Sequence, residues 1–172
     1  MSTERLTVEP WLSGSLTDVP VVARAVLHSL ELARQDIVLW CGELTDAELN
    51  ARPNRVAPVA FHVRHICRSI DRLLTYAEGH LLTPAQMEAM KAELDPGATH
   101  DSLFWEFRTT MERTPPRVRL LGAGSLETPR GVGRKTLPTT VGGLLIHVAE
   151  HTQRHVGQAV TTAKIVMAPK LL

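Results

Sequence analysis

Four long segments of this 172-residue chain repeat apolar residues every three or four positions, and this pattern constrains the fold more than any other feature. At roughly 3.6 residues per turn, such spacing places the apolar side chains on one face of an α-helix. No segment alternates polar and apolar residues convincingly, as a half-buried strand would. The pattern predicts an all-α fold, a four-helix bundle in which each helix buries its stripe against the others.

Capping residues, prolines and glycines set the expected helix boundaries. The first helix should begin with Asp18 as its cap and Pro20 near its first turn, and Gly42 can end it. The pair Pro115–Pro116 must end or kink the third helix, because proline has no N–H to donate inside a helix. The glycine- and proline-rich stretch Gly122–Pro138 is typical of a loop. The first two long helices are expected at about residues 18–41 and 58–78. The third should begin at Thr99 or Asp101 and reach the prolines, and it is expected to resume at 118–121. The last should begin at Thr139 or Thr140 and end at about 166.

A long crossover joins the second and third helices. It contains one short capped helix, Thr83–Leu94, followed by the turn Asp95–Gly97. Another short helix, Thr45–Ala51, is expected in the first connection and is ended by Pro53. With no internal repeat, the chain is expected to form a single domain over residues 1–172, with its core at about 18–168.

Charge and composition give no sign of a nucleic-acid or anionic-membrane partner. The formal net charge is +1, and the basic residues are scattered. Arg64, Arg68 and Arg72 are spaced as the solvated side of a helix, and Asp71 with Arg72 is expected to be an exposed pair, with a role in orienting or screening the entrance of a site as the alternative. No stretch approaches the roughly 20 apolar residues that a membrane-spanning helix needs.

The N-terminus and the cysteines favour a cytoplasmic protein. The segment MSTERLTVEPWL has acidic residues and no long apolar core, so it does not resemble a signal peptide. Cys41 and Cys67 lie in separate helical patterns without CxxC spacing. Two reduced, partly buried thiols are the simplest interpretation, with a disulfide as the alternative.

Three histidines spaced four residues apart, His147, His151 and His155, form a column on the last helix. With Leu144 as the zero direction, His151 and His155 fall within about 20° of the core seam, and His147 lies about 60° to one side. A core imidazole without hydrogen-bond partners costs about 1–3 kcal/mol. Two of them one turn apart therefore suggest a metal site, and a satisfied polar core is the alternative.

The second helix carries a further histidine pair, His62 and His65. Its apolar stripe runs through Ile66 and Ile70, and His62 falls inside this stripe. His65 lies about 60° to one side, within reach of a neighbouring helix. Spacing alone mildly favours His62 as the inward-facing group. The two pairs together predict a metal site between two helices.

The sequence resembles the DinB/YfiT-like family of metal-binding four-helix bundles from about Val19 to Val166. The resemblance rests on VAFHVRHICRSIDRLL, on LPTTVGGLLIHVAEH and above all on HTQRHVGQ. In that family, one histidine of the second helix and two of the last hold a divalent metal. The resemblance implies that the ligands are His65, His151 and His155. The resemblance then leaves two roles for His62 and His147: they lie behind the ligands and support them, or they serve as alternative ligands.

Three neutral imidazoles without a carboxylate leave a metal with at least one open coordination position, as in catalytic zinc sites. Zinc or nickel is the expected metal, although imidazole also suits cobalt and iron. Gln158, one turn beyond His155, either hydrogen-bonds a ligand or substrate or is simply solvated. Glu150 points away from the seam by about 120° and should face solvent.

Two functions remain open for such a site. The first is a metal-dependent thiol S-transferase or hydrolase acting on a small-molecule substrate, because similar proteins of the DinB/YfiT-like group include enzymes that use low-molecular-weight thiols. The second is a non-catalytic, stress-related metal-binding bundle. A dimerising helical module without metal is a third account, and a homodimer is expected in any case. No catalytic side chain is identifiable from the sequence.

Overall fold

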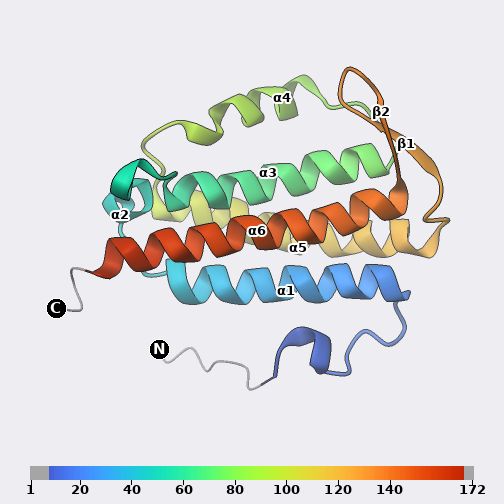
Figure 1. Ribbon diagram of the computed structural model, residues 1–172, viewed down its shortest axis with the longest axis horizontal. Helices are drawn as coiled ribbons and strands as arrows, with labels where there is room; N and C mark the ends of the chain where they lie inside the picture. The colour runs from blue at the N-terminus through green and yellow to red at the C-terminus, as the bar shows by residue number, and fades with distance from the viewer. Residues whose placement is uncertain (1–7, 169–172) are drawn as a thin grey trace.

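Four long helices form the body of the protein, as the apolar spacing predicts (Figure 1). The structure is a computed structural model that describes residues 8–168. The first of these helices buries an apolar stripe that includes Val26, Leu30 and Ile37. The four helices are α1 (Val21–Cys41), α3 (Val59–Ala77), α5 (His100–Ala123) and α6 (Val141–Met167).

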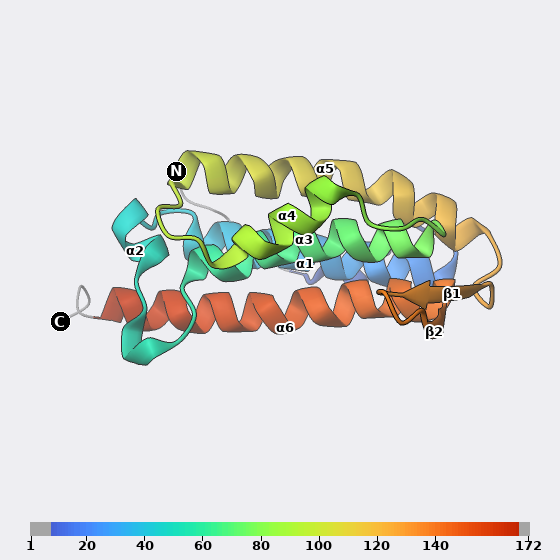
Figure 2. The same cartoon turned by 90° about the horizontal axis from the view of Figure 1, so that it is seen from above.

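The helices are arranged in a ring around one core. Helix α6 packs against α1 and α3, and α5 packs against the same two helices from the other side (Figures 1 and 2). Ile37, Ile66, Phe107 and Leu145 meet in the middle and are at most 2 % exposed. The seam between α3 and α6 is therefore opposite the seam between α1 and α5.

Short elements fill the connections. Helix α2 (Asp46–Asn50) begins with a capping box formed by Thr45 and Glu48. In the long crossover, helix α4 (Pro84–Lys91) continues into the 3-10 turn η3 (Ala92–Leu94). Two further 3-10 turns are η1 (Pro10–Leu12), before α1, and η2 (Pro53–Arg55), before α3.

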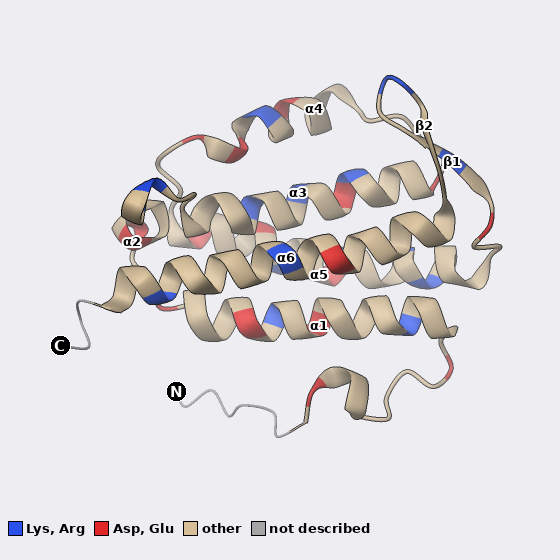
Figure 3. Cartoon of the chain, viewed as in Figure 1, with Lys and Arg blue, Asp and Glu red and all other residues tan. Residues whose placement is uncertain are grey.

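The crossover runs along α3 and covers the face that was expected to be solvated (Figures 1 and 3). The Arg68 guanidinium donates to Glu106 at 2.8 Å and to the Ala89 carbonyl oxygen at 2.6 Å. Arg72 binds Glu93 at 2.7 Å. The expectation of a solvated arginine face and of an exposed Asp71–Arg72 pair is wrong, because tertiary packing of α4, η3 and α5 supplies partners that helix periodicity cannot show.

Two helix boundaries also differ from expectation. Helix α1 begins at Val21 with Pro20 as its cap residue, and Asp18 instead accepts a hydrogen bond from Arg119 at 3.3 Å. At Pro115–Pro116, where the helix was expected either to end or to kink, α5 does not end but continues to Ala123. Proline inside a helix costs about 3 kcal/mol. Residues buried on both sides of the prolines outweigh this cost, and Figure 2 shows the second half of α5 inclined to the first.

The expected loop before the last helix contains a small β-hairpin. Strands β1 (Pro129–Val132) and β2 (Leu137–Thr140) pair antiparallel around a turn in which Gly133 has φ +71°. Each strand has only four residues, too few for an alternating pattern to be recognised. Thr140 then caps α6, because the Gly143 N–H donates to its Oγ1 at 3.1 Å. Within residues 8–168, no helix has the length and apolar character needed to cross a bilayer.

Candidate metal centre

Histidines of α3 and α6 meet in the seam between these helices. His65, His151 and His155 each present one ring nitrogen within 4.8 Å of those of the other two. The closest pair is Nε2 of His65 and Nε2 of His151, at 2.8 Å. Nitrogen ligands about 2.0–2.1 Å from a tetrahedral zinc ion lie roughly 3.3 Å apart. The three residues therefore form a group that can hold a metal ion.

Glu93, at the end of the crossover, fixes the orientation of His65. Its Oε2 lies 2.6 Å from His65 Nδ1, and its Oε1 accepts from Arg72 at 2.7 Å. Burial alone would raise the pKa of the Glu93 carboxyl, but the hydrogen bonds from His65 and Arg72 outweigh burial and hold this pKa below its usual value. The ionised carboxylate therefore accepts a hydrogen bond from Nδ1–H of His65. The lone pair of His65 then lies on Nε2, which faces His151.

His62 lies behind the group rather than in it. It is 5 % exposed, as its place in the apolar stripe predicts, and its Nδ1 lies 3.1 Å from Nδ1 of His155. This contact occupies one nitrogen of His155 and leaves its Nε2 available. Phe61 stacks on the His65 ring at a centroid distance of 5.4 Å and meets His155 edge-on at 6.2 Å. The rings therefore hold one another in place.

His147 continues the column without joining the group. Its ring lies 5.2 Å from that of His151, but its Nδ1 is bound to Glu150 at 2.6 Å on the solvent side. Glu150 is exposed, as expected from its bearing. Gln158 is exposed one turn beyond His155, and among the described residues it forms no hydrogen bond with the histidines. The structure thus brings together three of the six candidate residues, places His62 directly behind them and leaves His147 at the edge.

Burial keeps the inner imidazoles neutral. The pKa of His151 and the pKa of His155 are each lowered to about 4, first by burial and then by the neighbouring His65. The same two causes lower the pKa of His62 to about 4. Neutral imidazole is the form that binds a metal. Two rings of the group, His151 and His155, can therefore coordinate a cation at neutral pH without first losing a proton.

The donor set fits a metal with an open position. In the described part of the chain, the group able to hold a metal contains histidines and no carboxylate. Nδ1 of His151 is buried and has no hydrogen-bond partner among the described residues. Nε2 of His65, which keeps the lone pair because Nδ1 donates to Glu93, lies 2.8 Å from Nε2 of His151, so one cation between the two nitrogens can bind both rings.

The cysteines do not contribute a nucleophile. Cys41 and Cys67 are both free and buried, so the alternative of a disulfide is wrong. Burial raises the pKa of the Cys41 thiol to about 12 and raises the pKa of Cys67 even further. Both thiols are therefore protonated at neutral pH and serve as core residues.

Comparison with known proteins agrees with this architecture. The model of a family described as the DinB superfamily matches residues 29–159, which is more than half of the 172-residue chain. The matched region contains the three clustered histidines and Glu93. A search of curated proteins found no match.

Proposed function

Because the chain belongs to the DinB superfamily and gathers three histidines from two helices, we propose that it binds one divalent metal through His65, His151 and His155. Zinc or nickel is the proposed ion, since three imidazoles suit both. The observation that carries the proposal is the convergence of their ring nitrogens within 4.8 Å. Glu93 supports it, because ligating histidines usually donate their second N–H to a carboxylate.

The proposed activity is that of a thiol S-transferase or hydrolase acting on a small molecule. A divalent metal with an open position lowers the pKa of a bound thiol or water and so supplies a nucleophile near neutral pH. The protein's contribution is to hold the imidazoles of His151 and His155 neutral and to fix the His65 ring through Glu93. The Phe61 ring against His65 offers an apolar wall beside the site. A low-molecular-weight thiol is the proposed co-substrate.

A turnover assay tests the catalytic part of the proposal. Protein loaded with zinc or nickel is mixed with glutathione and a chlorodinitrobenzene, and separately with nitrophenyl acetate. The assay is repeated with His151→Ala and with His80→Ala, a matched control at an exposed histidine outside the site. Metal-dependent turnover that His151→Ala abolishes and His80→Ala retains supports the enzyme. One bound metal without turnover across several thiols and esters supports the non-catalytic, stress-related alternative.

Partner and location follow as further parts of this proposal. We expect a homodimer, which light scattering of the metal-loaded protein measures directly. A cytoplasmic location is proposed from the two free, buried cysteines, because reduced thiols are typical of that compartment.

A further inference from the structure

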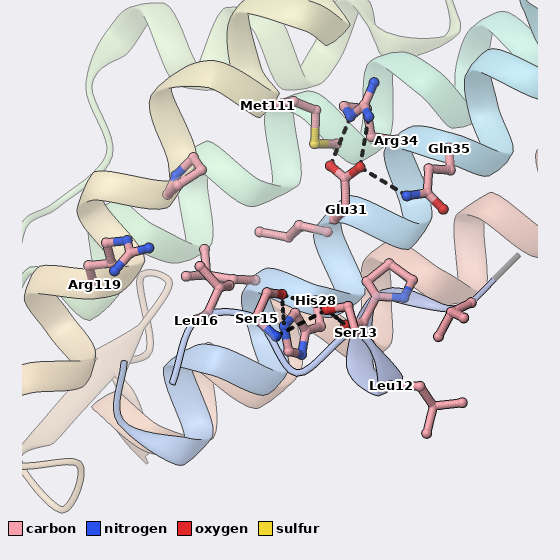
Figure 4. A pocket seen from close by; sticks show the side chains of 15 residues that line it. Leu12, Ser13, Ser15, Leu16, His28, Glu31, Arg34, Gln35, Met111 and Arg119 are labelled. Carbon is pink, nitrogen blue, oxygen red and sulfur yellow. Dashed lines mark hydrogen bonds and ion pairs between the residues drawn. The ribbon is translucent and has the colours of Figure 1, made fainter. Parts of the chain in front are cut away.

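A cavity of about 680 Å³ lies on the side of the bundle opposite His65, His151 and His155. Its walls are the segment that carries η1, the outer face of α1 and the middle of α5 (Figure 4). No residue of α3 or α6 lines it, so it is separate from the metal centre. Pockets that bind small molecules usually measure roughly 300–1,000 Å³. The cavity is therefore large enough for a ligand of that class.

Most of the lining is apolar, and the charges within it are already paired. Leu16, Leu27, Leu30 and Met111 are among the apolar residues. Arg34 forms two hydrogen bonds with the Glu31 carboxylate, at 2.9 and 2.7 Å. Arg119, at the other end, binds Asp18 at 3.3 Å. Since each arginine is balanced by a carboxylate, the lining favours a neutral ligand over an ion.

One buried polar side chain, His28, faces this cavity. It is 8 % exposed, and its Nε2 lies 3.2 Å from Oγ of Ser15. The Ser15 hydroxyl is 2.6 Å from that of Ser13, and Ser13 donates to the Pro10 carbonyl oxygen at 2.6 Å. In Figure 4, His28 of α1 lies beside Ser13 and Ser15, which belong to the N-terminal segment that forms one wall of the cavity.

The direction of this hydrogen-bond chain fixes the tautomer of His28. Ser13 uses its one hydroxyl proton on Pro10, so it accepts from Ser15. Ser15 has then used its own proton and accepts from His28. The imidazole therefore carries its proton on Nε2, and Nδ1 has a lone pair without a partner among the described residues. Nδ1 is thus the nitrogen by which His28, a lining residue of the cavity, can accept a hydrogen bond from a ligand.

We propose that this cavity binds a neutral small molecule that combines an apolar body with a hydroxyl group, an alcohol or a phenol, whose O–H donates to Nδ1 of His28. The apolar body contacts the leucines and Met111. A carboxylate or a phosphate is disfavoured, because an anion has no proton to donate and finds no unpaired arginine. Binding here does not require the metal, since the two sites share no residue.

The test uses para-butylphenol and its methyl ether, para-butylanisole, as matched probes. Each is titrated into the full-length protein while leucine and methionine methyl signals are followed by NMR. We expect saturable shifts at Leu27, Leu30 and Met111, and a dissociation constant about threefold to tenfold higher for the ether, which has lost the donor. Affinity should be equal with and without chelator. Equal affinity for phenol and ether, shifts confined to α3 and α6, or loss of binding on chelation would overturn the proposal.

Variants assign the binding to this cavity. Met111→Trp fills it and should abolish binding, whereas Leu120→Trp, at a 76 % exposed position on the same helix, should not. His28→Phe should lower the affinity for the phenol to that for the ether and leave the affinity for the ether unchanged. Circular dichroism confirms that each variant is folded. Binding retained by Met111→Trp, or seen only after removal of residues 1–7, contradicts the proposal, and the latter would assign the cavity to the chain's own N-terminus.

Discussion

Glu93 accepts a hydrogen bond from Nδ1 of His65 at 2.6 Å and lies between this ring and the guanidinium of Arg72. One residue of the crossover thereby orients a histidine of α3 toward the two histidines of α6. The long crossover therefore does more than cover α3, because its Glu93 also positions a histidine of the site. A carboxylate behind a ligating histidine also raises the basicity of that ligand.

Replacing Glu93 should weaken metal binding without removing it. In Glu93→Gln the His65 ring loses its charged acceptor, so the metal dissociation constant should rise about 10- to 100-fold. Competition with a chromophoric chelator measures this constant. Glu88→Gln is the matched control, because among residues 8–168 the Glu88 carboxylate pairs only with the exposed Lys91, and this variant should leave the constant unchanged. An unaltered affinity in Glu93→Gln would show that the carboxylate does not act through His65.

Removing a histidine of the group should abolish stoichiometric binding. Wild-type protein is expected to retain about one equivalent of metal after dialysis, and His155→Ala less than about a tenth, because two imidazoles hold a divalent cation far more weakly than three. Elemental analysis gives both values. His80→Ala serves as the control and should match wild type. Full metal content in His155→Ala contradicts the assigned ligand set.

The metal-free protein should lose stability as the pH falls from about 6.5 toward 4. The pKa values of His62, His151 and His155 are about 4 in the folded state, against 6.5 for the unperturbed group. Between these values the unfolded chain binds more protons than the folded one, so the free energy of unfolding falls with falling pH. Urea unfolding of chelator-treated protein at several pH values measures the trend. A flat or opposite dependence across this window would contradict neutral, buried imidazoles.

Replacing each of two glycines with alanine should change the stability of the protein in opposite directions. At Gly122 of α5, an added Cβ would lie 2.3 Å from Cβ of Ala23, so Gly122→Ala must push α1 and α5 apart and lower the melting temperature. At Gly157 of α6, an added Cβ meets nothing within 4 Å. Gly157→Ala should therefore stabilise the protein by about 0.5–1 kcal/mol through its helix propensity. Thermal unfolding of both variants checks the pair, and destabilisation by Gly157→Ala would show that α6 packs differently.

The sequence predicts the helices and much of the site, because both depend on local spacing. Apolar periodicity located α1, α3 and α6, and the four-residue spacing placed His151 and His155 on one face. The choice of His65 over His62 came from the family resemblance, since helix rotation read from apolar stripes is uncertain by tens of degrees. The structure brings His65 together with His151 and His155 and places His62 directly behind His155.

What the sequence did not predict depends on tertiary contacts. Glu93 is 28 residues from His65, and no local pattern connects them. The arginines of α3 look solvated until the crossover is placed over them. Pro115–Pro116 breaks a local rule that the core packing of α5 overrides, and the strands Pro129–Val132 and Leu137–Thr140 are too short to show periodicity. The first three of these features become visible only when distant segments are brought together, whereas the hairpin was missed because its strands are short.

The most direct test is an anomalous-scattering measurement on crystals of the zinc- or nickel-loaded protein, recorded at the absorption edge of the added metal. We expect one strong peak about 2.0–2.2 Å from a ring nitrogen of each of His65, His151 and His155. A peak bound elsewhere, or one that touches only a single helix, would contradict the claim that α3 and α6 share one cation.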